Sequence, residues 1–285
     1  MSNNEHLFNH GGFAALSDLQ SEDWRLLYGR LEHEQSRFLA AEGKFRSPEY
    51  KWPRDPLHTW SRVWEYPYVF FHLEKIRHEF PENKLLKVAD IGSGVTFFPF
   101  SVARLGYDVT CIDIDPICAR DIPSASKVID CSPGHVGADL IADGRIPLPD
   151  ASQDVVYCIS VLEHVPNPAT TLSEIYRILK PGGAFIITVD IDLRGNSELG
   201  INAFNELLDK ADDMFCKLLT NRSIHPSDYL NTANSPYHIK DNSLVRISKR
   251  VVALMLGKYD FIGDLRVGVF LTVHASVYHK AKLSD

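Results

Sequence analysis

Residues 88–94 constrain the fold of this chain more than any other stretch. A short apolar run there contains one acid, Asp90, and is followed at once by Gly92 and Gly94. Such a pattern is typical of a buried parallel strand that turns tightly into a helix. Because glycine has no Cβ, two glycines let the backbone come close to a ligand. The stretch therefore predicts an α/β fold with a ligand site at a strand end.

A second apolar run, residues 109–113, ends in another acid, Asp113. It follows the first run by about twenty residues, the spacing at which a second strand can place a carboxylate on a ribose. The two acids together predict a nucleoside-bearing cofactor on a doubly wound sheet, and hence an enzyme. The alternative is a tight strand-to-helix turn that binds no ligand.

The glycine spacing restricts the kind of cofactor. A dinucleotide-binding turn has a third glycine three positions after the second, where this chain has Phe97. Asp90 would also repel a phosphate. S-adenosylmethionine has a ribose and an adenine but no phosphate, and its ammonium and sulfonium groups tolerate a nearby carboxylate.

The composition of the 285 residues is that of an ordinary globular protein, with 45% hydrophobic and 24% charged residues. A formal net charge of −7 argues against a broad surface for nucleic acid. Five cysteines without close metal-binding spacing favour a reducing compartment. No stretch has the length of a membrane span and the start does not resemble a signal peptide, so we expect a cytoplasmic protein without a membrane partner.

The alternating α/β pattern begins at residue 87, and residues 1–84 are expected to form a helical cap. In the cap, Ser17 and Gln20 are expected to form a capping box, and Pro67 to kink or break an aromatic segment. Strands are expected at residues 88–91, 108–112, 138–142, 154–160, 184–189 and 267–279. Helices are expected at residues 97–105, 168–179, 204–219 and 244–256.

Five motifs then follow in a familiar order, at residues 90–94, 111–113, 146–156, 161–164 and 178–183. Their order and spacing resemble those of the class I S-adenosylmethionine-dependent methyltransferase family, in its small-molecule or saccharide type. The resemblance covers residues 86–190. It departs from the family at Thr96, where many members have a third glycine.

The resemblance implies a Rossmann-like, doubly wound sheet of seven strands, mostly parallel, with an antiparallel last strand. It places the methyltransferase domain at residues 85–285, behind the helical cap at residues 1–84. Residues 195–245 lie outside the resemblance and are expected, at about these bounds, to form a lid-like insertion in this domain. S-adenosyl-L-methionine is the cofactor that the family uses.

The resemblance also assigns roles to matching positions. Gly92 and Gly94 pass under the methionine part of the cofactor, Asp90 holds its ammonium, and Asp113 binds the ribose hydroxyls. Asp143 accepts a hydrogen bond from the adenine amino group, with the Gly144 backbone nearby. Asp139 could take that role instead, and Asp143 could be a plain turn residue. The other cofactor-site candidates, which lie beside these motifs, are Ser93, Ile114 and Ser160.

The candidates for the acceptor side lie at the ends of two later strands. Glu163 and His164 follow the fourth strand, and His164 is either the catalytic base or a packing residue beside the cofactor. Asp190 and Asp192 end the fifth strand, where ligands bind in such sheets. They could act as a base, as substrate anchors or, with further ligands, at a divalent metal. The alternative is a pair of turn carboxylates, and no metal site is predicted.

Three further groups of residues have both a functional and a structural interpretation. One group could form a lid over the substrate or a solvated loop: His225, Tyr229, Tyr237 and His238. A second group could stack on a sugar or an aromatic substrate or belong to the core: Trp60, Trp64, Tyr66 and Tyr68. A third group gives a C-terminal helix a basic face, either solvated or facing nucleic acid: Lys240, Arg246, Lys249 and Arg250.

Taken together, these patterns predict an enzyme that transfers a methyl group from S-adenosylmethionine to a small molecule or a saccharide, preferably to oxygen. Nucleic acid is not an expected partner. One alternative is a methyltransferase for RNA or protein. Another is a protein that binds S-adenosylmethionine without catalysing a reaction.

Overall fold

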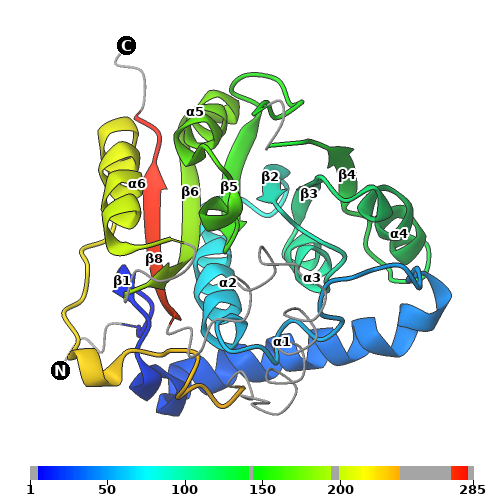
Figure 1. Ribbon diagram of the computed structural model, residues 1–285. Helices are drawn as coiled ribbons and strands as arrows, with labels where there is room; N and C mark the ends of the chain where they lie inside the picture. Colours follow the sequence, from blue (N-terminus) through cyan, green and yellow to red (C-terminus); the bar gives the residue numbers. More distant parts are fainter. Residues whose placement is uncertain (1–5, 141–143, 194–198, 238–270, 282–285) are drawn as a thin grey trace, which may run out of the picture.

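The computed structural model describes residues 6–140, 144–193, 199–237 and 271–281. A central sheet has the strand order β1-β8-β6-β5-β2-β3-β4 (Figure 1). Its main strands are β2 (Leu86–Ile91), β3 (Tyr107–Asp113), β4 (Gly134–Gly137), β5 (Gln153–Ile159), β6 (Leu179–Asp192) and β8 (Leu271–His279).

The sheet is doubly wound, as the sequence predicts. Strand β2 pairs in parallel with both β3 and β5, which places Ile91 beside Ile112 on one side and beside Cys158 on the other. Strand order reverses at this point, and in such sheets the crevice at the carboxyl ends of the strands is where ligands bind. The last strand, β8, runs antiparallel to β6, which confirms the predicted antiparallel end of the sheet.

Helices cover both faces because successive residues of a strand point to opposite sides. In β2, Val88 belongs to the core on one face and Ala89 to the core on the other. Helices of the first face are α1 (Glu22–Ala41), α2 (Arg62–His78), α3 (Phe98–Arg104) and α4 (Pro116–Ser126). Helices of the second face are α5 (Pro168–Ile178) and α6 (Ile201–Met214).

The N-terminal segment also contributes a strand. Strand β1 (Gly12–Phe13) pairs antiparallel with β8, and β7 (Cys216–Lys217) pairs with the other end of β8. Among the described residues the sheet therefore has eight strands, where seven were expected. Helix α1 contacts α2 and α3 and runs along the bottom of the view in Figure 1.

Helix α2 continues through Pro67, so the break that was one of the two expectations there does not occur. A proline within a helix leaves the carbonyl four residues earlier without its N–H donor. That carbonyl belongs to Val63, and Trp24 Nε1 of α1 donates to it at 2.9 Å. A tryptophan from the neighbouring helix thus replaces the missing backbone donor.

Other local expectations were wrong at the ends of elements. Helix α1 is capped by Ser21, whose Oγ accepts from the Trp24 N–H at 3.1 Å, whereas Ser17 lies in a short 3-10 helix, η1 (Leu16–Gln20). Helix α6 ends at Met214, so residues 215–219 are not helical and two of them form β7. Strand β4 precedes the residues 138–142 that were expected to form it.

Three short 3-10 helices complete the described elements: η2 (Glu42–Lys44), η3 (Leu162–His164) and η4 (Pro226–Asp228). The helix expected at residues 244–256 and the start of the strand expected at 267–279 lie outside the described residues. Among the helices that the structure describes, none combines the length and apolar character that crossing a bilayer requires.

Candidate active site

A cavity of about 730 Å³ opens at the carboxyl ends of the central strands. Its walls come from the carboxyl ends of β2, β3, β5 and β6, from the residues that follow β2, β3 and β5, and from residues 50–66, which connect α1 to α2 and begin α2. This volume is within the range of small-molecule and cofactor sites. The cavity is therefore the candidate active site.

The turn after β2 forms one wall of this cavity. Gly92 and Gly94 both adopt left-handed backbone conformations, with φ of 72° and 54°. A Cβ at Gly92 would lie 2.4 Å from Cγ2 of Val161, and a Cβ at Gly94 would lie 2.9 Å from Oη of Tyr50. Glycine is required at both positions because the conformation and the space exclude a side chain.

Asp113 ends β3 and supports this turn. Its Oδ2 accepts from the Gly94 N–H at 2.7 Å, and its Oδ1 accepts from the Asp115 N–H at 2.8 Å. Each carboxylate oxygen has a second acceptor site, so the group can still take two hydroxyl donors. Asp113 and its neighbour Ile114 both line the cavity.

Asp90 lines the same cavity from beneath the glycine turn and is only 5% exposed. Burial raises its pKa to about 8, Asp113 adds to this effect, and the Tyr157 hydroxyl opposes it. No described cation forms an ion pair with Asp90. A buried carboxyl without a counter-charge is suited to a ligand that brings a cation.

Residues 89–187 match the family model of a methyltransferase domain. The match spans the strands from β2 to β6 and the glycine turn. Over these residues the chain therefore matches a methyltransferase domain, in agreement with the predicted class I S-adenosylmethionine-dependent type.

Curated relatives of this methyltransferase domain are ubiquinone biosynthesis O-methyltransferases. The chain is 32% identical over 107 residues to the one from Pseudomonas entomophila, which covers 36% of this chain and 44% of the relative. It is 34% identical over 111 residues to the one from Cupriavidus pinatubonensis, with 38% and 43% covered. The chain thus spans less than half the length of the curated relatives that it matches.

Two solved structures share the fold over nearly the whole chain. A putative sarcosine dimethylglycine methyltransferase from Galdieria sulphuraria has a TM-score of 0.52 at 16% identity, with 89% of this chain and 99% of that chain covered. The [4+2]-cyclase SpnF has a TM-score of 0.51 at 16% identity, with 90% and 95% covered. One is named a cyclase and the other a methyltransferase, so the shared fold alone does not determine which reaction is catalysed.

The structure brings most of the predicted cofactor-site residues of the methyltransferase domain to one cavity. These residues are Asp90, Gly92, Ser93, Gly94, Asp113, Ile114 and Ser160. Gly144 is left-handed, with φ of 62°, but it does not line the cavity. Asp143 lies outside the described residues, so its role stays a prediction.

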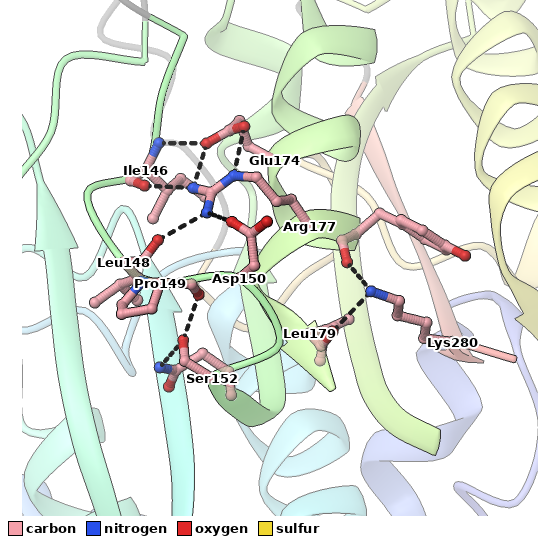
Figure 2. A network of polar contacts seen from close by, with 11 residues as sticks. Ile146, Leu148, Pro149, Asp150, Ser152, Glu174, Arg177, Leu179 and Lys280 are labelled. Atoms are coloured by element: carbon pink, nitrogen blue, oxygen red, sulfur yellow. Dashed lines mark hydrogen bonds and ion pairs between the residues drawn. The ribbon is translucent and has the colours of Figure 1, made fainter. Parts of the chain in front are cut away.

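The loop that leads from Gly144 to β5 is held by one side chain of α5. Arg177 donates to the Ile146 and Leu148 carbonyls at 2.7 and 2.8 Å and to Asp150 at 2.6 Å (Figure 2). Glu174 completes the network, because it pairs with Arg177 and accepts from the Ile146 N–H at 2.9 Å. Helix α5 thereby fixes the backbone of residues 146–150.

The predicted acceptor-side residues separate into two groups. His164, exposed at the rim, and Asp190, 8% exposed, both line the cavity. Glu163 does not line it, but its Oε1 accepts from the Asp190 N–H at 2.9 Å, and burial raises its pKa to about 8. Asp192 is buried beyond the cavity wall.

Two polar residues of α2 reach this site that sequence reasoning did not select. Arg62 lines the cavity and forms an ion pair with Glu65, which is 0% exposed. The Arg62 guanidinium and the Glu65 carboxylate both bind Ser160, at 2.8 and 2.6 Å. The available signal was a pair of opposite charges three residues apart within an otherwise aromatic run.

The aromatic residues of the cap are divided between core and cavity. Trp60 and Tyr66 line the cavity, whereas Trp64 and Tyr68 pack in the core at 3% and 0% exposure. From the predicted lid, Tyr237 lines the cavity and its hydroxyl contacts the Tyr28 hydroxyl at 2.9 Å.

The rest of the predicted lid does not reach the cavity where the structure describes it. Tyr229 stacks on Phe13 and His225 is exposed, and neither lines the cavity. His238 lies outside the described residues, as do the basic residues expected at 240–250. Within the described part of the chain, no group of three or more potential metal ligands occurs.

Proposed function

We propose that this protein transfers the methyl group of S-adenosylmethionine to a hydroxyl oxygen of a small molecule. The observation that carries the proposal is the position of Asp90 between the glycine turn and Asp113, as a buried carboxyl that forms an ion pair with none of the cations in the described residues. A ligand that offers an ammonium to one acid and ribose hydroxyls to the other satisfies both.

The residues present fit this cofactor from end to end. Asp90 would hold the ammonium, Asp113 the ribose hydroxyls, and the apolar side chains of Ile114, Ala138 and Leu140 the adenine. When bound, the cofactor supplies a methyl group on a sulfonium, which is an excellent leaving group. The cavity extends past this set to Trp60 and Asp190, where an acceptor has room.

The chain has three tasks in such a transfer. The cavity walls align the acceptor oxygen with the methyl carbon, and the aromatic residues at the mouth exclude water. A base must take the hydroxyl proton, a contribution that is about 10²–10⁴-fold in rate for a positioned group. His164 at the rim and Asp190 on the floor are the two candidates from the sequence that line the cavity.

The acceptor class follows from the lining on the acceptor side. Trp60 lines the cavity together with Tyr66 and Phe98, whose rings stack on each other, and these three residues give it an aromatic wall suited to a flat or apolar acceptor. The names of the curated relatives support transfer to oxygen. A saccharide could stack on the same rings, so it is the second acceptor class that we propose. A cytoplasmic location stays a prediction.

Methyl transfer from S-adenosylmethionine with an isotope-labelled methyl group tests this function. The acceptor panel contains a catechol, a phenol, a hydroxy acid and a monosaccharide, with RNA and a protein as the alternative classes. We expect label in one of the hydroxyl-bearing small molecules, and less label with Asp113→Ala at the same cofactor concentration. Label only in RNA or protein, or cofactor binding without any transfer, would overturn the proposal.

A further inference from the structure

A buried polar cluster lies beneath the acceptor end of the cavity. It joins two residues of α2, Arg62 and Glu65, to Ser160 after β5 and to Thr188 and Asp190 of β6. All but one lie outside residues 89–187, which match the family model. The domain's resemblance to its relatives therefore says nothing about most of this cluster.

The hydrogen bonds of Ser160 show where one proton of the cluster lies. A serine hydroxyl has one donor hydrogen and two acceptor lone pairs. Ser160 Oγ donates to Glu65 Oε1 at 2.6 Å and accepts from Arg62 Nη1 at 2.8 Å. Ser160 Oγ can offer the same hydrogen to Asp190 Oδ1, but only at 3.3 Å. Because that single hydrogen lies closer to Glu65, Asp190 receives at most a weak hydrogen bond from Ser160, and burial without a strong donor favours a protonated Asp190.

Glu65, by contrast, has a cationic partner and two hydroxyl donors. It accepts from the hydroxyls of Ser160 and Thr188, and Arg62 pairs with its second oxygen. Because Arg62 forms its ion pair with Glu65, its positive charge is already compensated and stabilises an ionised Asp190 only in part.

The groups around Asp190 act on its pKa in both directions. Burial raises the pKa of Asp190 well above its ordinary value, Glu65 and Glu163 add to this effect, and Arg62 and Ser160 oppose it. His164 faces the same cavity from η3, and Asp192 lies two residues further along β6.

Ser160 has an unusual backbone that directs its hydroxyl into the cluster. Its φ is 47°, in the left-handed region that a non-glycine residue rarely adopts. Such an outlier persists where surrounding contacts fix it, and here three side chains bind the Ser160 hydroxyl.

We propose that Asp190 is the proton acceptor of the methyl transfer and that it is an anion only while the positively charged methyl donor is bound. Glu65 and Arg62 are positioning residues that act on Asp190 through Ser160. The inference rests on the proposed function. With the cavity empty, Asp190 keeps its proton. Beside a sulfonium cation, Asp190 releases that proton to solvent and becomes an anion.

The later step balances in charge and in atoms. Asp190 takes the hydroxyl proton of the acceptor as the acceptor oxygen forms its bond to the methyl carbon. The electron pair of the broken carbon–sulfur bond stays on sulfur. Asp190 is then neutral beside a neutral thioether, so neither stage leaves an unpaired charge in this part of the cavity.

Calorimetry in buffers of different ionisation enthalpy tests this inference without an acceptor. It counts the protons released when S-adenosylmethionine binds and when S-adenosylhomocysteine binds. Both ligands carry the ammonium that faces Asp90, so the difference between them isolates the sulfonium. We expect about one more proton released with S-adenosylmethionine at pH 7. If neither ligand binds, the proposed function fails; if both bind with equal proton release, only this inference fails.

Two variants complete the test. In Asp190→Asn, which keeps the shape of the side chain, the difference in proton release should vanish while both ligands still bind. Glu65→Gln removes a negative charge near Asp190, so the pH at which the difference disappears should fall by about one unit or more. Glu74→Gln is the matched control. Glu74 lies on α2, as Glu65 does, but it pairs with Arg30 of α1 and does not line the cavity. A difference that persists in Asp190→Asn, or a Glu65→Gln profile equal to that of Glu74→Gln, would overturn the inference.

Discussion

Asp113 gives the sharpest test of cofactor binding, because its carboxylate has two measurable tasks. It accepts from the backbone N–H groups of Gly94 and Asp115, and we propose that it also accepts from both ribose hydroxyls. Asp113→Ala removes both tasks at once. Asp113→Asn keeps one acceptor oxygen but loses the charge, so its effect should be intermediate.

The size of the effect follows from the bonds that are lost. A hydrogen bond to a charged group contributes about 1.5–3 kcal/mol, so two ribose bonds amount to about 3–6 kcal/mol at most. Each 1.4 kcal/mol or so is a factor of ten in affinity. Because neighbouring bonds are not additive, we expect S-adenosylhomocysteine binding to weaken by about 10- to 1000-fold in Asp113→Ala.

Calorimetric titration of the folded variants measures this effect, and Asp115→Ala is the matched control. Asp115 follows two residues later and caps α4, where its Oδ1 accepts from the Ile117 N–H at 2.9 Å. Its loss should cost about 0.5–2 kcal/mol of stability and leave the affinity nearly unchanged. Unchanged affinity in a folded Asp113→Ala protein would refute the ribose role.

The remaining predictions concern pH, the cavity rim and the loop after Gly144. Burial holds the pKa of Asp90 at about 8 in the folded state, against 3.8 in the unfolded chain, so the native state keeps a proton and stability falls as pH rises between these values. Asp90→Asn should flatten this fall, by up to about 1.4 kcal/mol per pH unit in urea unfolding, and an unchanged slope would contradict the assignment. His164→Ala should leave S-adenosylhomocysteine affinity within a few-fold and lower turnover less than about tenfold. Asp190→Asn should lower turnover about 10²–10⁴-fold. A larger loss of turnover in His164→Ala than in Asp190→Asn would make His164 the base. Arg177→Gln removes the hydrogen bonds that hold residues 146–150 and should weaken S-adenosylhomocysteine binding several-fold. Lys180→Gln, the control, breaks the ion pair with Asp154 and should leave this affinity unchanged. Equal affinities of the two variants would show that residues 146–150 do not contribute to cofactor binding.

The sequence predicted those parts of the site that local chemistry determines. Gly92 and Gly94 had to be glycines because of their left-handed backbone, and Asp113 had to end its strand to reach the turn. These requirements act over a few neighbouring residues, so spacing along the chain reveals them. The doubly wound sheet follows from the same alternation of apolar runs and turns.

The parts that sequence reasoning missed depend on contacts between distant segments. Glu65 becomes a site residue only because α2 packs against β6, which brings it to Thr188, 123 positions away along the chain. Pro67 stays within a helix only because Trp24 bonds the free carbonyl of Val63. A two-residue strand such as β1 has no pattern of its own, and pairing with β8 alone defines it.

The central claim is that this cavity binds S-adenosylmethionine and not a dinucleotide. Calorimetric titration of the purified protein with S-adenosylhomocysteine and, separately, with NAD tests it directly. The account predicts micromolar binding of S-adenosylhomocysteine, about −8 kcal/mol, and no heat of binding with NAD. Binding of NAD without binding of S-adenosylhomocysteine would contradict the claim.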